Sequence, residues 1–266
     1  MIISPAHTPS KQAPHYQELA GILSEFEHIT LTQMDSVMLF DRVDTKFLFA
    51  VHQLPAIIAA MREDYFTLEV KNTRIHTYHS LYYDTPEFMH YLRHHNGMKS
   101  RYKFRHRIYV ESDLHFFEIK EKTNKERTLK SRVMLKDKII GITPEVVELV
   151  SINTPYRAEA LVPKLWSNFH RITMVHKTRQ ERLTIDMNIL FANSEKCVHA
   201  TGAVIIELKQ EKMNYGIPLM RLLISRGIRP KGLSKYTMGV VNLYEGLKKN
   251  NFKPNQSIIH KISKLS

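Results

Sequence analysis

The sequence predicts an α+β fold in which an antiparallel β-barrel of about eight strands encloses a tunnel and helices pack outside it. Several segments alternate between charged and apolar residues, as half-buried strands do, and the charged residues recur on one face of each segment. If the apolar faces pack under helices, the charged faces must line an enclosed space or face solvent. A closed barrel of about eight strands leaves room for one ligand. An open sheet with a basic surface fits the same alternation.

The clearest of these segments is residues 99–110, KSRYKFRHRIYV, where lysine or arginine occupies every odd position from 99 to 107. Because successive strand side chains point to opposite faces, this spacing predicts a strand with one wholly cationic face. Like charges about 7 Å apart along one face repel one another. An anionic chain lying along the strand would compensate them. The simpler alternative is an amphipathic strand whose charged side faces water.

The segments before this strand predict a loose leader followed by helices and strands. Residues 1–14 carry three prolines with serine and threonine, which favours a flexible leader. Apolar residues at helical spacing predict a helix over 16–31, and the alternation of RVDTKFLF predicts a strand over 42–49 with one charged side. Further predicted elements are a short helix, a tyrosine-rich strand and a helix closed by Asn-Gly, at 54–61, 75–84 and 86–95.

The segments after the basic strand predict two more strands with charged faces, then helices, then a second group of strands. The predicted strands are 115–123, 128–134, 171–179, 182–190 and 203–210, with a tight hairpin at Gln180-Glu181, and the predicted helices are 144–150, 156–169, 217–225 and 234–247. Residues 248–266 are basic and polar without periodicity, which predicts a flexible tail. No repeat or linker divides the chain, so residues 15–247 are predicted to form a single domain.

Charge and cysteine content limit the possible partners and compartment. There are 39 Lys+Arg against 26 Asp+Glu, a formal net charge of +13, which favours an anionic partner. Cys197 is the only cysteine, so no internal disulfide forms. No stretch resembles a signal peptide or an apolar run of about 20 residues. These features predict a cytoplasmic protein.

Seven short motifs, in the same order, resemble those of a known family. They match the VTC-type polyphosphate polymerase domain, a branch of the triphosphate tunnel metalloenzymes (the CYTH-like superfamily), here in a stand-alone form. The match runs from about residue 40 to residue 244. The motifs are Arg42-Val43-Asp44-Thr45-Lys46-Phe47, Tyr82-Tyr83-Asp84-Thr85, Lys103-Phe104-Arg105-His106-Arg107, Glu118-Ile119-Lys120-Glu121-Lys122, Arg182-Leu183-Thr184-Ile185-Asp186, Ile206-Glu207-Leu208-Lys209 and Ser234-Lys235-Tyr236.

The resemblance implies a tunnel that binds ATP and polyphosphate or triphosphate. It implies transfer of the terminal phosphoryl group of ATP onto a growing polyphosphate chain, with help from Mn²⁺ or Mg²⁺. Phosphoryl transfer requires a protein mainly to position the donor and acceptor and to stabilise negative charge on phosphate oxygens. Lysine, arginine and a metal provide that stabilisation. The attacking phosphate oxygen is already ionised, so the reaction needs no general base.

The resemblance also implies roles for individual residues. Glu207 would bind the metal, with Glu118 as a possible helper. Without the resemblance, an ion pair between Glu207 and Lys209 is an equal alternative, and Asp186 is expected to pair with Arg182. The substrate-binding set is Arg42, Lys46, Lys103, Arg105, Arg107, Lys120, Lys122, Arg179, Ser234 and Lys235, and the catalytic set is Lys120, Arg105, Arg107 and Glu207.

Two alternatives from other functional classes remain open. A triphosphatase on the same barrel would hydrolyse inorganic or nucleoside triphosphate. Only Asp44 lies between Arg42 and Lys46, which argues against a two-metal site of that kind. A non-catalytic polyanion or nucleic-acid-binding module would also be basic, but stacking on nucleic acid needs aromatics on the cationic face. The aromatics here lie on the opposite face, so no specific nucleic acid is expected. Any membrane association would come through a partner protein.

Overall fold

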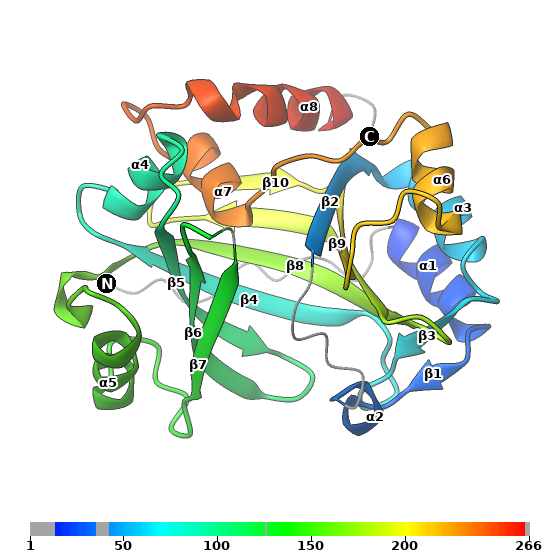
Figure 1. Cartoon of the computed structure of the whole chain (residues 1–266), viewed down its shortest axis with the longest axis horizontal. Coiled ribbons are helices and arrows are strands. Elements are labelled where there is room, and N and C mark those ends of the chain that lie inside the picture. The colour runs from blue at the N-terminus through cyan, green and yellow to red at the C-terminus, as the bar shows by residue number, and fades with distance from the viewer. Residues whose placement is uncertain (1–13, 36–42, 126, 264–266) are drawn as a thin grey trace.

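The computed structural model describes residues 14–35, 43–125 and 127–263. Two features expected from the sequence therefore lie outside the described residues. These are the flexible leader, apart from Pro14, and Arg42. Figure 1 shows the whole chain, with a curled sheet in the middle and helices around it.

One antiparallel sheet forms the centre of the molecule. Its main path, in spatial order, is β2 (Val43–Ala50), β11 (Ala203–Gln210), β9 (Glu181–Ala192), β8 (Val162–His176), β4 (His76–Asp84), β5 (Arg101–Tyr109), β6 (Leu114–Lys122) and β7 (Thr128–Met134). Three short strands attach to this path. β3 (Tyr65–Leu68) pairs with β8 and, in parallel, with β1 (His28–Ile29), and β10 (Cys197–Ala200) pairs with β9.

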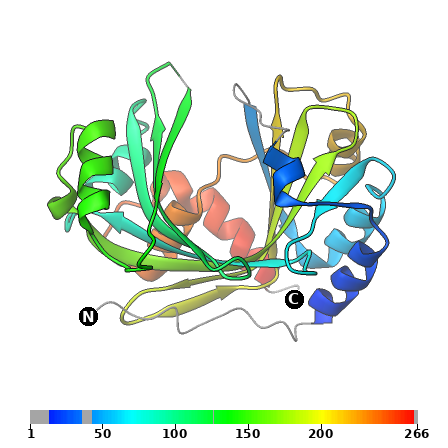
Figure 2. The same cartoon turned by 90° about the horizontal axis from the view of Figure 1, so that it is seen from below.

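The sheet curls into a half-barrel, which confirms the predicted antiparallel α+β fold of about eight strands (Figure 2). The barrel is not closed by strand pairing, because β7 pairs only with β6 among the described residues. The free edge of β2 is occupied instead by residues 230–231. Phe47 and Pro230 form a β-bridge, and the Lys231 N–H donates to the Lys46 carbonyl at 2.8 Å.

Two apolar clusters hold helices against the convex side of the sheet. α1 (Pro14–Ser24), α3 (Leu54–Ala59) and α6 (Pro218–Ser225) pack on β2, β8, β9 and β11 through residues such as Leu19, Ile57 and Leu223. α5 (Pro144–Asn153) covers β5 and β6 through Val146 and Val150. The remaining short elements are α2 (Leu31–Asp35), η1 (Val51–Gln53), α4 (Met89–His95), η2 (Ala158–Ala160) and η3 (Asn250–Phe252).

One helix lies inside the curl rather than outside it, which differs from the prediction. α7 (Lys235–Leu243) packs against the concave side of the sheet through a third cluster that includes Leu165, Phe169 and Phe191. The approach is close, since a Cβ at Gly239 would lie 2.9 Å from the side chains of Leu165 and Phe191. Figure 2 shows α7 within the curl. The helix therefore fills part of the concave face and leaves the rest for polar residues.

The predicted helix over 156–169 is wrong. This segment contains only η2 before β8, which begins at Val162. The reason is that β8 is buried on both faces, with Leu165 and Phe169 against α7 and Trp166 in the cluster beneath α5. A continuous apolar run does not distinguish a buried strand from a helix. The expected two-residue hairpin at Gln180-Glu181 is likewise a longer loop, residues 177–180.

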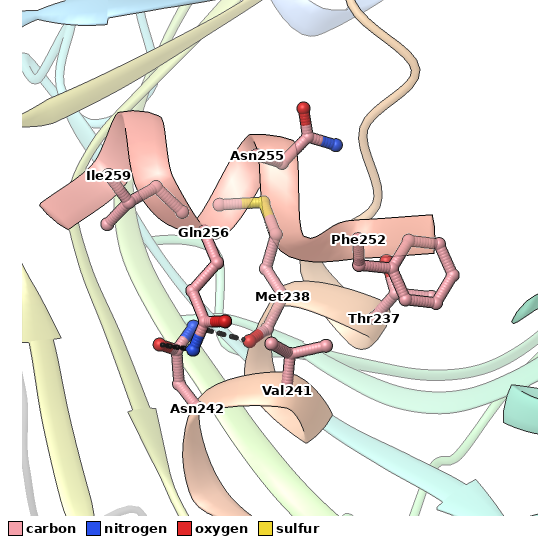
Figure 3. Close-up of a pocket in the computed structure, with 8 residues that line it drawn as sticks. All are labelled: Thr237, Met238, Val241, Asn242, Phe252, Asn255, Gln256 and Ile259. Carbon is pink, nitrogen blue, oxygen red and sulfur yellow. Dashed lines mark hydrogen bonds between the residues drawn. The ribbon is translucent and has the colours of Figure 1, made fainter. Parts of the chain in front are cut away.

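The C-terminal segment, for which the sequence predicted no regular structure, contains η3 and α8 (Lys253–Ser263). α8 covers α7 with Ile259 and Ile262 buried, so the flexible-tail prediction is wrong for these residues. Isoleucines three residues apart give one apolar face of a helix, a signal that a basic, polar composition hides. Figure 3 shows a small pocket between α7 and the segment formed by η3 and α8, lined by Thr237, Met238, Val241, Asn242, Phe252, Asn255, Gln256 and Ile259.

Candidate functional site

The charged residues of β5, β6 and β7 stand in register on the concave side of the sheet. Lys103 of β5 lies opposite Lys120 of β6, and Lys120 lies opposite Lys130 of β7. We call these three residues the lysine row. Two residues further along, Arg105 lies opposite Glu118 and Glu118 opposite Arg132. The first row is entirely cationic, whereas the second contains a carboxylate.

Glu118 neutralises its own row. Its carboxylate accepts from Arg105 Nε at 2.7 Å and lies 2.5 Å from Lys130 Nζ, and its side chain is only 1% exposed. Burial alone would raise the pKa of Glu118. The positive charges of Arg105, Arg107 and Lys130 outweigh burial and hold this pKa well below its usual range. Glu118 therefore stays ionised and fixes the direction of Arg105.

In the lysine row, Lys130 is paired with Glu118, but Lys103 and Lys120 have weaker compensation. Lys103 Nζ donates to the uncharged Ser234 Oγ at 2.9 Å, and Lys120 Nζ lies 3.7 Å from Asp44 Oδ2. Burial, followed by repulsion from Lys46 and Lys120, holds the pKa of Lys103 well below its usual value. Negative charge brought near Lys103 would stabilise its protonated form.

The opposite arm of the half-barrel brings Glu207 to the same place. Glu207 of β11 lies opposite Lys46 of β2, with Oε1 3.4 Å from Lys46 Nζ and Oε2 2.5 Å from Lys209 Nζ. Burial alone would raise the pKa of Glu207. The positive charges of Lys209, Lys46 and Lys120 outweigh burial and hold this pKa well below its usual range. Lys120 belongs to the other arm, and it pairs with Asp44 of β2. The charged strand faces therefore converge, as the alternation predicted.

A third group of charges lies where the charged face meets α7. Arg171 of β8 donates from Nε and Nη2 to the two Asp186 oxygens at 2.6 and 2.7 Å. Lys235 Nζ also donates to Asp186. Burial would raise the pKa of Asp186, but these two cations lower it to about 2. Nearby, the buried Arg107 donates to Ser80 Oγ at 3.2 Å.

Most of the residues expected from the sequence lie together on this surface, which we call the charged concave face. Lys122 occupies the same face, opposite Arg101. Arg179 does not join them through any contact in the described residues. It lies in the β8–β9 loop, 3.8 Å from Glu181. The members of the charged concave face are Lys46, Lys103, Arg105, Arg107, Glu118, Lys120, Lys122, Lys130, Arg171, Asp186, Glu207, Ser234 and Lys235.

Sequence reasoning missed Arg171 and mispaired Asp186. Because residues 156–169 were predicted to be a helix, Arg171 stood at the first position of the next strand. In the structure it is well inside β8 and takes the place beside Asp186 that Arg182 was expected to fill. The sequence placed Lys130 and Arg132 on one charged face of the predicted strand 128–134, and they occupy such a face, but neither was included among the predicted site residues.

The acidic residues fit one kind of metal site. Among the described residues, no three His, Cys, Asp or Glu side chains gather as a metal centre would require. Mg²⁺ commonly needs only one or two protein carboxylates when substrate phosphates supply further oxygens. Glu207 and Asp44 lie on adjacent strands, facing the same side, and fit that arrangement. Glu118 fits it less well, because its side chain is only 1% exposed, against 17% for Glu207.

Comparison with known proteins gives one family match. The model of the family described as "VTC domain" matches residues 41–244. No curated protein matches the chain. No helix in the described ranges is long and apolar enough to cross a membrane.

Solved structures with a similar fold have low sequence identity. A candidate adenylate cyclase from Bacillus halodurans is 11% identical, with a TM-score of 0.51, over 77% of this chain and 98% of its own. A candidate adenylyl cyclase from Hippeastrum, described as having a dominant triphosphatase activity, is 13% identical with a TM-score of 0.47, over 78% and 98%. The first shows a shared fold and nothing more, and the second lies below a TM-score of 0.5.

Proposed function

The chain belongs to the VTC domain family, and on that premise we propose that it transfers the terminal phosphoryl group of ATP onto a polyphosphate chain bound along the charged concave face. Family membership supports a tunnel enzyme that acts on phosphoryl groups. The choice of ATP as donor and polyphosphate as acceptor is our proposal.

The lysine row is the observation that carries this proposal. Lys103, Lys120 and Lys130 lie side by side on three neighbouring strands. Like charges placed directly opposite each other in a sheet destabilise it, by roughly 0.2–1 kcal/mol per pair. A phosphate chain places a negative charge at every repeat, so a single ligand can compensate the whole row. A neutral or singly charged ligand cannot.

Each group on this face has a task that phosphoryl transfer requires. Lys46, Lys103 and Lys120 would contact phosphate oxygens as mobile point charges, whereas Arg105 is fixed by Glu118 and presents a planar fork. Ser234 and Lys235 stand at the N-terminus of α7, where backbone N–H groups favour anions. These cations would hold the donor and acceptor in line and stabilise charge as it develops on the transferred group.

Glu207 and Asp44 would hold the divalent metal. When bound, Mn²⁺ or Mg²⁺ would draw charge from the phosphate oxygens that it contacts. The protein's own contribution is to keep Glu207 ionised, which Lys46 and Lys209 already do. We leave Glu118 out of the metal site and assign it to orienting Arg105.

The test is incubation of the full chain with ATP and Mn²⁺ or Mg²⁺, followed by gel analysis. We expect a long anionic polymer that an added polyphosphatase degrades, and no polymer with Lys103→Met. Release of inorganic phosphate from triphosphate without any polymer would favour a triphosphatase instead. Binding of random-sequence RNA in preference to polyphosphate would favour the non-catalytic module. Cytoplasmic location and a membrane-bound partner stay predictions, which cell fractionation can check.

A further inference from the structure

A buried carboxylate outside the charged concave face ties two helices together. Asp84, at the end of β4, is fully buried. Its Oδ1 accepts from the backbone N–H groups of Thr85 and His90 at 2.7 and 2.9 Å. Its Oδ2 accepts from the Tyr91 N–H at 2.9 Å and from the Tyr236 hydroxyl at 2.5 Å. The bonds from His90 and Tyr91 cap the start of α4, the bond from Thr85 is local, and the fourth reaches α7.

Tyr236 is adjacent in sequence to Lys235 and two residues after Ser234, so it lies in the first turn of α7. Its side chain is 2% exposed, and its ring stacks on Tyr82 with the centroids 5.2 Å apart. Burial and the nearby Asp84 carboxylate raise its pKa well above the ordinary value. The phenol therefore keeps its proton and remains a hydrogen-bond donor to Asp84 at any pH at which the protein is used.

The first turn of α7 lacks the usual means of holding itself in place. Ser234 occupies the N-cap position but makes no side-chain cap hydrogen bond. Its Oγ accepts from Lys103 Nζ instead. An N-cap side chain that caps its helix contributes typically about 1 kcal/mol. Ser234 makes no such contribution, so the start of this turn depends on other contacts. Besides the bond from Tyr236 to Asp84, these are the bonds from Lys46 Nζ to the Leu233 carbonyl at 3.3 Å and from Thr237 Oγ1 to the Ser234 carbonyl at 3.0 Å.

We propose that Asp84 is a positioning residue that acts through the Tyr236 hydroxyl to hold Ser234 and Lys235 at the charged concave face. The proposal rests on the function proposed above, since it assigns α7 to the binding of the phosphate chain. Asp84 touches no substrate in this scheme. It sets the place of the α7 first turn relative to β4 and β5, and thereby the distance between Lys103 and Ser234.

The alternative is that Asp84 only stabilises the fold by capping α4. Tyr236→Phe separates the two roles, because it removes one hydroxyl and leaves the three backbone donors to Asp84 in place. Tyr244→Phe is the matched control. Tyr244 stands at the C-terminal end of α7, and its hydroxyl donates to the Lys164 carbonyl at 2.5 Å. Both variants delete one phenol hydrogen bond to α7, at opposite ends of the helix.

The experiment measures tripolyphosphate binding to the full chain by calorimetry, with urea unfolding as a check on stability. We expect Tyr236→Phe to weaken binding about tenfold, since small displacements of contact groups have effects of this size or larger. We expect Tyr244→Phe to bind as the parent does. Equal binding by the two variants, at matched stability, would overturn the proposal.

A double-mutant cycle with Ser234→Ala adds a readout that a merely structural role would not move. If Tyr236 acts through the first turn of α7, the losses of the two single variants overlap and the double variant loses less than their sum. Additive losses overturn the proposal. Parent protein that binds no tripolyphosphate overturns this proposal and the proposed function together. Loss of binding in Lys103→Met but not in Tyr236→Phe overturns only the positioning role.

Hydrogen exchange of the parent needs no variant and covers the case in which Tyr236→Phe fails to fold. The Met238 N–H donates to the Ser234 carbonyl at 2.9 Å, the bond that closes the first turn. If Asp84 already holds this turn, the Met238 amide is protected before tripolyphosphate is added. Protection that appears only with tripolyphosphate would overturn the proposal.

Discussion

Lys103 of β5 lies directly opposite Lys120 of β6, and both side chains belong to the charged concave face. Two residues along the same strands, Arg105 lies opposite Glu118 and is bonded to it. One face of one strand pair thus carries a repelling contact next to an attracting one. Removing a cation should have opposite effects on stability at the two positions.

We expect Lys103→Met to leave the free energy of unfolding unchanged or to raise it by about 0.5 kcal/mol, since it relieves the repulsion from Lys120. Arg105→Met should lower it by roughly 1–3 kcal/mol, because the buried Glu118 then loses one of its two ion-pair partners, Arg105, and keeps Lys130. Urea unfolding of the two variants and the parent, without ligand, is the measurement. Equal destabilisation by both would show that Lys103 is as well paired as Arg105.

Tripolyphosphate should stabilise the protein, because it binds the folded chain and compensates the lysine row. Binding to the native state alone adds about 2.7 kcal/mol at a hundredfold excess over the dissociation constant. The melting temperature should rise with tripolyphosphate concentration, most steeply at low ionic strength. Thermal unfolding at two salt concentrations checks this, with Lys103→Met as the variant whose response shrinks. A rise that salt does not weaken would exclude charge as its source.

The alternation of charge made the strands and the shared face predictable. Lys103, Lys120 and Glu207 stand where a period of two puts them, and the strand boundaries of β5, β6 and β7 agree with the sequence to within two residues. The register between strands was not predictable from one sequence. It decides that Lys103 meets Lys120 while Arg105 meets Glu118, and so decides which cations lack compensation.

Two other features depend on long-range packing. The apolar segment that contains Trp166 and Phe169 is compatible with a helix or with a strand. Only its burial on both faces of β8 decides between the two. Because the sequence predicted a helix there, Arg171 was expected at the start of a strand and was not recognised as a site residue. The place of α7 inside the curl depends on Gly239, which allows Leu165 and Phe191 to approach closely. A single glycine in a helical pattern does not by itself predict such a close contact.

Glu207→Gln should remove the effect of metal on ligand binding while leaving tripolyphosphate binding without metal at least as strong. The change deletes one negative charge, so Lys46 and Lys209 are freed for phosphate. Calorimetry with and without Mn²⁺ or Mg²⁺ measures this directly, and Glu211→Gln, an exposed position just after β11, is the control. An unchanged metal effect would place the metal elsewhere.

Acid should destabilise the protein partly through His106. Its ring is fully buried, with Nε2 3.1 Å from His115 Nδ1. Burial, and to a lesser degree His115, lower its pKa from 6.5 to about 4. Between these values the unfolded chain binds more protons than the folded one, so the free energy of unfolding falls as the pH drops through this window.

His106→Gln should therefore lose less stability than the parent between pH 7 and pH 5, by about 1–2 kcal/mol. Urea unfolding at the two pH values is the measurement. His52→Gln, at an exposed position, is the control and should lose as much as the parent. An identical loss in His106→Gln would mean that this ring is protonated in the folded protein.

Asp186→Asn should lower the stability of the protein and increase the rise in melting temperature that tripolyphosphate produces. The carboxylate of Asp186 is shared by Arg171 and Lys235, both mostly buried. Removing its charge leaves two cations without a carboxylate, which should lower the free energy of unfolding by about 3 kcal/mol. The same two cations then become available to an anion. Tripolyphosphate should raise the melting temperature of this variant by more than it raises that of the parent.

The control for this last prediction is Asp113→Asn, because Asp113 forms an exposed ion pair with Lys138 away from the charged concave face. Exposed pairs contribute about 0–1 kcal/mol, so neither its melting temperature nor its response to tripolyphosphate should change much. Thermal unfolding of all three proteins across a tripolyphosphate series gives the comparison. If Asp186→Asn is destabilised but responds no more than the parent, Arg171 and Lys235 cannot reach the bound phosphate, and the polyphosphate path ends before α7.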